Sequence, residues 1–75
     1  MFEKLKEILV EEINVNPDDV VPSAELVNDL GINSLELADL VLLCEEQFDI
    51  EIDENAARNF VTIQDVVEYL EKINN

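Results

Sequence analysis

One serine stands where a helix is expected to begin. The segment Leu30–Leu35 reads Leu-Gly-Ile-Asn-Ser-Leu, and Ser34 directly precedes a long run of apolar and acidic residues at helical spacing. The first backbone N–H groups of a helix have no intrahelical acceptor, and they lie at the positive end of the helix dipole. An anion attached there, such as a phosphate, is stabilised. The position of Ser34 therefore suits an exposed hydroxyl with an attached phosphate, although most serines at this position only cap the helix.

Ser34 is not expected to be a catalytic nucleophile. A nucleophilic serine needs an adjacent base, usually histidine, and the chain has no histidine. Cys44 is the only cysteine; we interpret it as a small buried hydrophobe that lines a cavity if the bundle opens one. It has no cysteine or histidine partner for a metal, and the acidic clusters do not match a calcium loop. The sequence thus predicts neither an enzyme nor a metal site.

The charge of the chain restricts its partners. Nineteen acidic residues face four basic ones, which gives a net charge of −15, and residues 7–57 contain fifteen of the acidic residues and no Lys or Arg. Such a chain repels nucleic acid and anionic membranes and attracts basic surfaces. We therefore expect no nucleic-acid partner, no membrane insertion and a monomer. Charged residues soon after Met1 do not resemble a signal peptide, and a single cysteine fits the reducing cytoplasm.

Helical spacing of apolar residues predicts helices over residues 2–14, 34–48 and 53–59. A last helix follows the capping sequence Thr62–Asp65 and runs to about residue 73, with inward positions at Ile63, Val66, Val67, Leu70 and Ile73. Residues 15–33 form a long loop, which we expect to be pinned to the core by Val20, Val21, Leu26 and Leu30. The prediction is a single all-α domain over residues 1–75. It is a four-helix bundle of three longer helices and one short helix, with the long loop between the first two helices.

Gly31-Ile32-Asn33-Ser34-Leu35 resembles the prosthetic-group site of acyl carrier proteins, whose usual form is Gly-x-Asp-Ser-Leu. Asn33 replaces the usual aspartate. The helix order is similar to that of the family over nearly the whole chain. The resemblance implies 4′-phosphopantetheine on Ser34, flanked by Asn33 and Leu35, with an acyl thioester on its terminal thiol. It also implies a freestanding acyl carrier protein for fatty acid biosynthesis or a related acyl or polyketide pathway.

The second predicted helix has an exposed face with both leucines and carboxylates. At helical spacing, residues 35, 39, 42 and 46 lie on one side, which is either a solvated face or a docking surface. The family resemblance favours docking. It implies contacts with a phosphopantetheinyl transferase and with acyl-loading, condensing and modifying enzymes that have basic patches. The implied docking residues are Glu36, Asp39, Leu42, Glu45 and Glu46, with Phe60 and Val61 bordering the same surface and the mouth of the cavity.

Two other functions remain open on the sequence. One is a carrier of aminoacyl or peptidyl groups; the strong acidity and the Leu-Glu pattern after Ser34 favour a fatty-acid-like system instead. The other is an unmodified acidic helical adaptor that acts only through protein contacts. Ser34 argues against the adaptor, whereas Asn33 argues mildly for it.

Overall fold

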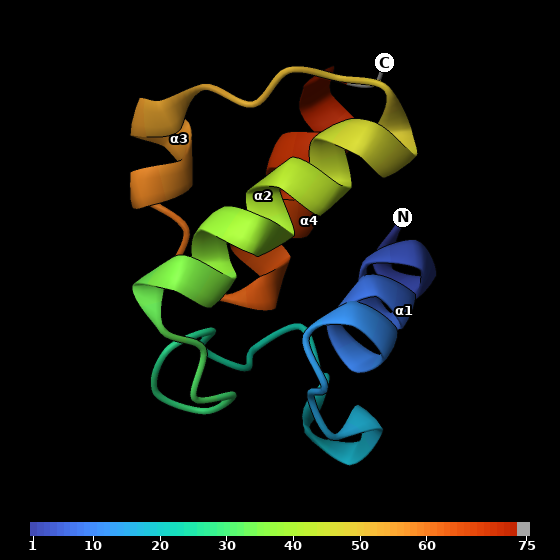
Figure 1. Ribbon diagram of the computed structural model, residues 1–75, viewed down its shortest axis with the longest axis vertical. Coiled ribbons are helices and arrows are strands. Elements are labelled where there is room, and N and C mark those ends of the chain that lie inside the picture. The colour runs from blue at the N-terminus through green and yellow to red at the C-terminus, as the bar shows by residue number, and fades with distance from the viewer. Residues whose placement is uncertain (74–75) are drawn as a thin grey trace.

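The computed structural model describes residues 1–73, and these form four α-helices and one 3-10 helix (Figure 1). The α-helices are α1 (Phe2–Glu12), α2 (Ser34–Phe48), α3 (Glu54–Arg58) and α4 (Ile63–Ile73), and the 3-10 helix is η1 (Pro17–Asp19). The predicted all-α bundle of three longer helices and one short helix is confirmed. None of these helices is long and apolar enough to cross a membrane.

Three of the helices share one core. In Figure 1, α2 runs through the middle of the molecule, with α4 behind it and α1 at its side. Their apolar residues recur at helical spacing, so each helix presents one stripe to the others. The buried residues of this core are Leu5, Ile8 and Leu9 of α1, Leu40 and Cys44 of α2, and Ile63, Val66, Val67 and Leu70 of α4. The short α3 contributes no fully buried residue, and only its half-buried Ala57 packs against this core.

The long loop is held against the segment that precedes α4. The Leu26 N–H donates to the Val61 carbonyl at 2.8 Å, and the Ile63 N–H donates to the Ala24 carbonyl at 3.0 Å. Val20 and Leu26 are buried, as predicted, and Leu30 is half-buried. The expectation for Val21 was wrong, because it is exposed. Val21 lies between two tight turns, closed by the bonds from its N–H to the Asp19 carbonyl and from the Ala24 N–H to its own carbonyl, and only Val20 of the pair reaches the core.

Some helix ends differ from the prediction. The first helix ends at Glu12 and not at residue 14, because Asn14 has a left-handed backbone with φ of 64°. Asparagine adopts this conformation more readily than most residues, and it stops the helix. Asp53 precedes α3 as its N-cap, as predicted, and its side chain accepts from the Asn55 N–H at 2.7 Å. At the last turn of α4, Ile73 is exposed and does not join the core.

The capping sequence before α4 is confirmed. The Asp65 N–H donates to Thr62 Oγ1 at 3.2 Å, and Asp65 Oδ2 accepts from the Thr62 N–H at 3.0 Å. Asp65 Oδ2 also accepts from the Val61 N–H at 3.1 Å. These backbone hydrogen bonds favour the ionised carboxyl and hold the pKa of Asp65 below its usual value. The same residues thus start α4 and order the segment to which the long loop is bonded.

Cys44 is a core residue, as the sequence predicts. Its side chain is 1% exposed, and it packs in the cluster shared by α1, α2 and α4. Burial, with a smaller contribution from the nearby charge of Glu45, raises the pKa of the thiol to about 12. The neutral thiol is therefore the form that the folded protein favours.

Replacement of Cys44 by alanine should change how stability depends on pH. The pKa of the thiol rises from its ordinary value of 9.0 to about 12 in the folded chain, so the unfolded state loses the proton first. The stabilising contribution is fully present below about pH 9 and is lost as the pH rises towards about 12. In urea titrations, the wild type should lose up to about 1.4 kcal/mol more per pH unit in this range than Cys44→Ala. Parallel pH profiles for the two proteins would contradict the buried, neutral thiol.

Candidate functional site

Ser34 is the first residue of α2, and its side chain is exposed. It is not the N-cap, because Asn33 occupies that position with an extended backbone. Gly31 makes the preceding turn with φ of 70°, a left-handed conformation that glycine adopts without strain from a Cβ atom. The interpretation of Ser34 as a helix cap is therefore wrong, and its hydroxyl is not used in capping.

Asn33 and Glu36 form a reciprocal capping box. The Glu36 N–H donates to Asn33 Oδ1 at 2.8 Å, and the Asn33 N–H donates to Glu36 Oε1 at 3.2 Å. The N–H groups of Ser34 and Leu35 make no hydrogen bond within residues 1–73. Two free donors and the positive end of the dipole of a 15-residue helix therefore lie beside the Ser34 hydroxyl. This arrangement suits an attached anion.

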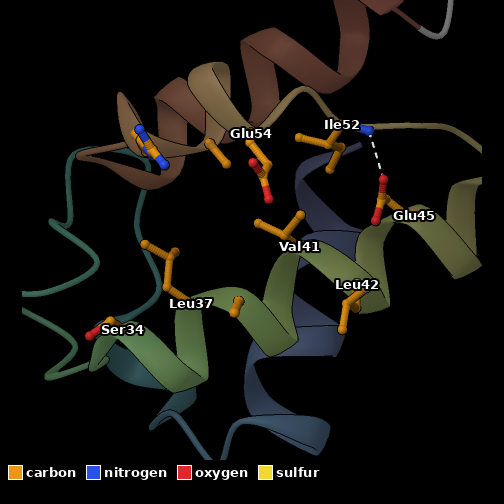
Figure 2. Close-up of a pocket in the computed structure, with 10 residues that line it drawn as sticks. Ser34, Leu37, Val41, Leu42, Glu45, Ile52 and Glu54 are labelled. Carbon is orange, nitrogen blue, oxygen red and sulfur yellow. Dashed lines mark hydrogen bonds between the residues drawn. The ribbon is translucent and has the colours of Figure 1, made fainter.

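An open groove of about 570 Å³ begins at Ser34 and follows α2. Figure 2 shows Ser34 near the start of α2, with Leu37 and Val41 further along the helix and Ile52 and Glu54 across from them. The surface inside the groove is mainly apolar. Its lining comprises Ser34, Leu37, Ala38, Val41, Leu42 and Glu45 from α2, and Ile52, Glu54, Ala57 and Arg58 from the linker and α3. Cys44 does not line this groove, because it points into the core.

The predicted docking residues divide into two groups. Leu35 and Leu42 are 80% and 57% exposed. Asp39, between them, and Glu46, one turn beyond Leu42, are exposed on the same side of α2. Glu36, Glu45 and Phe60 are each half-buried and engaged within the chain. Glu36 belongs to the capping box, Glu45 Oε2 accepts from the Ile52 N–H at 2.8 Å, and the Phe60 ring packs edge-on against Tyr69 with centroids 5.4 Å apart.

Sequence reasoning did not identify the far wall of the groove. Ile52, Glu54 and Arg58 face α2 only because the linker after α2 turns back alongside it, which no local pattern predicts. Phe60 was expected at the mouth of the cavity, but it does not line the groove. One signal was available for Arg58, since it is the only basic residue between Lys6 and Lys72.

The carboxylates are spread over the surface and do not converge. Within residues 1–73, no group of three or more His, Cys, Asp or Glu side chains lies close enough together to hold a metal ion. The groove offers a free hydroxyl with two free N–H groups at one end, a mainly apolar surface, and the charged side chains of Glu54 and Arg58 on its far wall.

Comparison with known proteins agrees with this site. Residues 3–70 match the protein family described as phosphopantetheine attachment site. The chain is 44% identical over 71 residues to an acyl carrier protein from Wolinella succinogenes, covering 95% of this chain and 93% of the relative. It is 46% identical over 69 residues to one from Bdellovibrio bacteriovorus, covering 92% and 88%. It is 40% identical over 73 residues to one from a Sulfurovum species, covering 97% of both chains.

The chain belongs to the phosphopantetheine-attachment family. Within that family it is of the acyl carrier type, so it is a carrier of acyl groups on 4′-phosphopantetheine and not an enzyme. The structure around Ser34 fits such a group on two grounds. The free N–H groups at the start of α2 suit a phosphate, and the groove beginning at Ser34 suits an apolar chain.

The capping box should respond differently to two substitutions of Asn33. Asn33→Ala removes the acceptor of the Glu36 N–H and should lower the free energy of unfolding by about 1 kcal/mol. Asn33→Asp keeps an acceptor of the same shape and should leave stability nearly unchanged. Urea denaturation at fixed salt measures both. If the alanine and aspartate variants are equally stable, the box does not hold the start of α2.

Proposed function

We propose that Ser34 Oγ is the attachment atom for 4′-phosphopantetheine and that the chain carries acyl groups for fatty acid biosynthesis or a related pathway. The observation that carries this proposal is the position of Ser34. It is exposed, it is free of any capping role, and it stands where two unpaired N–H groups meet the end of the groove. The serine, the start of α2 and the groove together meet the requirements of one covalently held, partly apolar group. A reducing cytoplasm remains our prediction for its location.

The groups around Ser34 have separate tasks in this proposal. The free N–H groups of Ser34 and Leu35 would stabilise the negative charge of a phosphodiester on Ser34, and the capping box of Asn33 and Glu36 holds the start of α2 in place. When attached, the prosthetic group supplies a terminal thiol that holds the acyl group as a thioester. Leu37, Val41 and the other apolar residues of the groove exclude water from an acyl chain.

The proposed partners bind the outer side of α2. Leu35 and Leu42 offer apolar contacts, and Asp39 and Glu46 offer exposed charges for the basic patches of a transferase and of acyl-loading, condensing and modifying enzymes. Charge complementarity of this kind accelerates association more than it strengthens the final complex. The engagement of Glu36 and Glu45 within the chain makes Asp39 and Glu46 the carboxylates most available to a partner.

Ser34 should be the only residue that takes up the prosthetic group. With coenzyme A, magnesium and a permissive transferase, intact mass should show one added phosphopantetheine on the wild type and none on Ser34→Ala. Ser23 is the only other serine and is also exposed, so Ser23→Ala is the matched control and should be modified normally. Modification of the Ser34→Ala protein would refute the assignment.

Reversal of charge on α2 should slow the transferase more than the same reversal on α1. Asp39→Lys with Glu46→Lys should reduce its association rate by on the order of tenfold at low salt and flatten the salt dependence. Glu3→Lys with Glu11→Lys changes the net charge equally on exposed positions of α1 and should have a much smaller effect. Stopped-flow association measures both pairs. Equal slowing by the two pairs would mean that only net charge matters.

A further inference from the structure

The linker between α2 and α3 packs on the core through Ile50 and Ile52, and most of its backbone N–H groups that are bonded donate to one residue, Glu45. Glu45 accepts three hydrogen bonds from this linker. Its backbone carbonyl accepts from the Asp49 N–H and from the Ile50 N–H at 3.1 Å, and its Oε2 accepts from the Ile52 N–H at 2.8 Å. A further bond runs from the Asp53 N–H to the Tyr69 hydroxyl at 3.2 Å. The bond to Oε2 is drawn in Figure 2, where Glu45 reaches across from α2 to the linker.

The position of this linker determines the far wall of the groove. Ile52 is 8% exposed and lines the groove, and Glu54 directly begins the helix that continues the same wall. No residue of α3 is fully buried and only the half-buried Ala57 packs against the core, so the position of α3 depends largely on the linker. A displacement of Ile52 therefore moves the wall that faces Leu37 and Val41.

Glu45 differs in this respect from its neighbour Glu46. Both carboxylates belong to the acidic end of α2, yet Glu46 is exposed and makes no side-chain hydrogen bond within residues 1–73, whereas Glu45 is half-buried and bonded. A hydrogen bond between a backbone N–H and an ionised carboxylate is shorter and stronger than a neutral one. A basic residue of a partner that pairs with Glu45 has to compete with that bond.

We propose that Glu45 is a positioning residue for the acyl-binding groove: its carboxylate fixes Ile52 and thereby the wall opposite α2. This inference rests on the proposed function in that it assigns the groove to the acyl chain. It separates Glu45 from the docking carboxylates Asp39 and Glu46. At position 45, the side chain has to be long enough for its acceptor oxygen to reach the Ile52 N–H. At position 46, the negative charge is what a basic partner would recognise.

Two substitutions of Glu45 distinguish reach from charge. Glu45→Asp keeps the charge but shortens the side chain, so its oxygens fall short of the Ile52 N–H; Glu45→Gln keeps the length and an acceptor oxygen but removes the charge. In the unmodified protein, native-state amide exchange at Ile52 should accelerate roughly tenfold in Glu45→Asp and clearly less in Glu45→Gln. The matched control Glu46→Asp should leave it unchanged. Exchange at Leu40, in the core of α2, reports any general loss of stability.

A second measurement reads the groove itself. In protein loaded with an octanoyl group, the methyl resonances of Leu37 and Val41 should shift on loading in the wild type and in Glu45→Gln. The shift should be largely lost in Glu45→Asp. An Ile52 exchange rate equal in Glu45→Asp and Glu46→Asp, or methyl shifts that follow the charge at position 45, would overturn the role of Glu45. Failure of the wild type itself to accept the octanoyl arm would instead refute Ser34 as the attachment residue and leave the exchange result standing.

Discussion

The geometry of the site depends on a few backbone hydrogen bonds between the long loop and the segment before α4. The Leu26 N–H donates to the Val61 carbonyl, and the Ile32 N–H donates to the Leu26 carbonyl at 3.0 Å, so the end of the loop is anchored to the segment between α3 and α4. Leu26 and Ile32 are both buried, which excludes water from these bonds. The turn at Gly31 and the N-cap Asn33 adjoin Ile32 in the sequence, so the same hydrogen bonds hold them in place. A serine at the start of a helix is common; this one is held in place by the tertiary structure.

The charge distribution is as important as the fold. All buried side chains in residues 1–73 are apolar, so the carboxylates lie at the surface or half-buried, where water or backbone N–H groups solvate them. A small domain with a net charge of −15 repels itself, and local hydrogen bonds to carboxylates offset part of that repulsion. Glu36, Glu45, Asp53 and Asp65 each accept from at least one backbone N–H. The acidity that attracts basic partners thus also organises the ends of α2, α3 and α4.

The sequence predicted those features that local chemistry determines. Residues 34–48 were predicted as a helix with its observed bounds, because a cap, a glycine turn and apolar periodicity agree there. Contacts between segments that are distant in the sequence were not predicted. The bond from Glu45 to Ile52 spans seven residues across a linker whose path no local pattern fixes, so Glu45 reads from the sequence only as another surface acid. The groove wall around Arg58 could not be predicted for the same reason. The left-handed backbone of Asn14 ends α1 earlier than the spacing of its apolar residues predicts.

The sides of α2 face different surroundings, which we call sectors: the core, the groove and solvent. This restricts where residues can be inserted into the chain or deleted from it. Successive residues of a helix are separated by about 100° around its axis. Leu40 and Cys44 face the core, Val41 and Glu45 face the groove, and Asp39 faces solvent. One residue inserted near the start of α2 would rotate everything beyond it by one sector, so that Asp39 would enter the core and Leu40 the groove; a deletion would bring Glu45 into the core and turn Leu40 towards solvent. Insertions and deletions are therefore expected in the long loop and at the chain ends, whereas the spacing from Ser34 to Glu45 has to be kept.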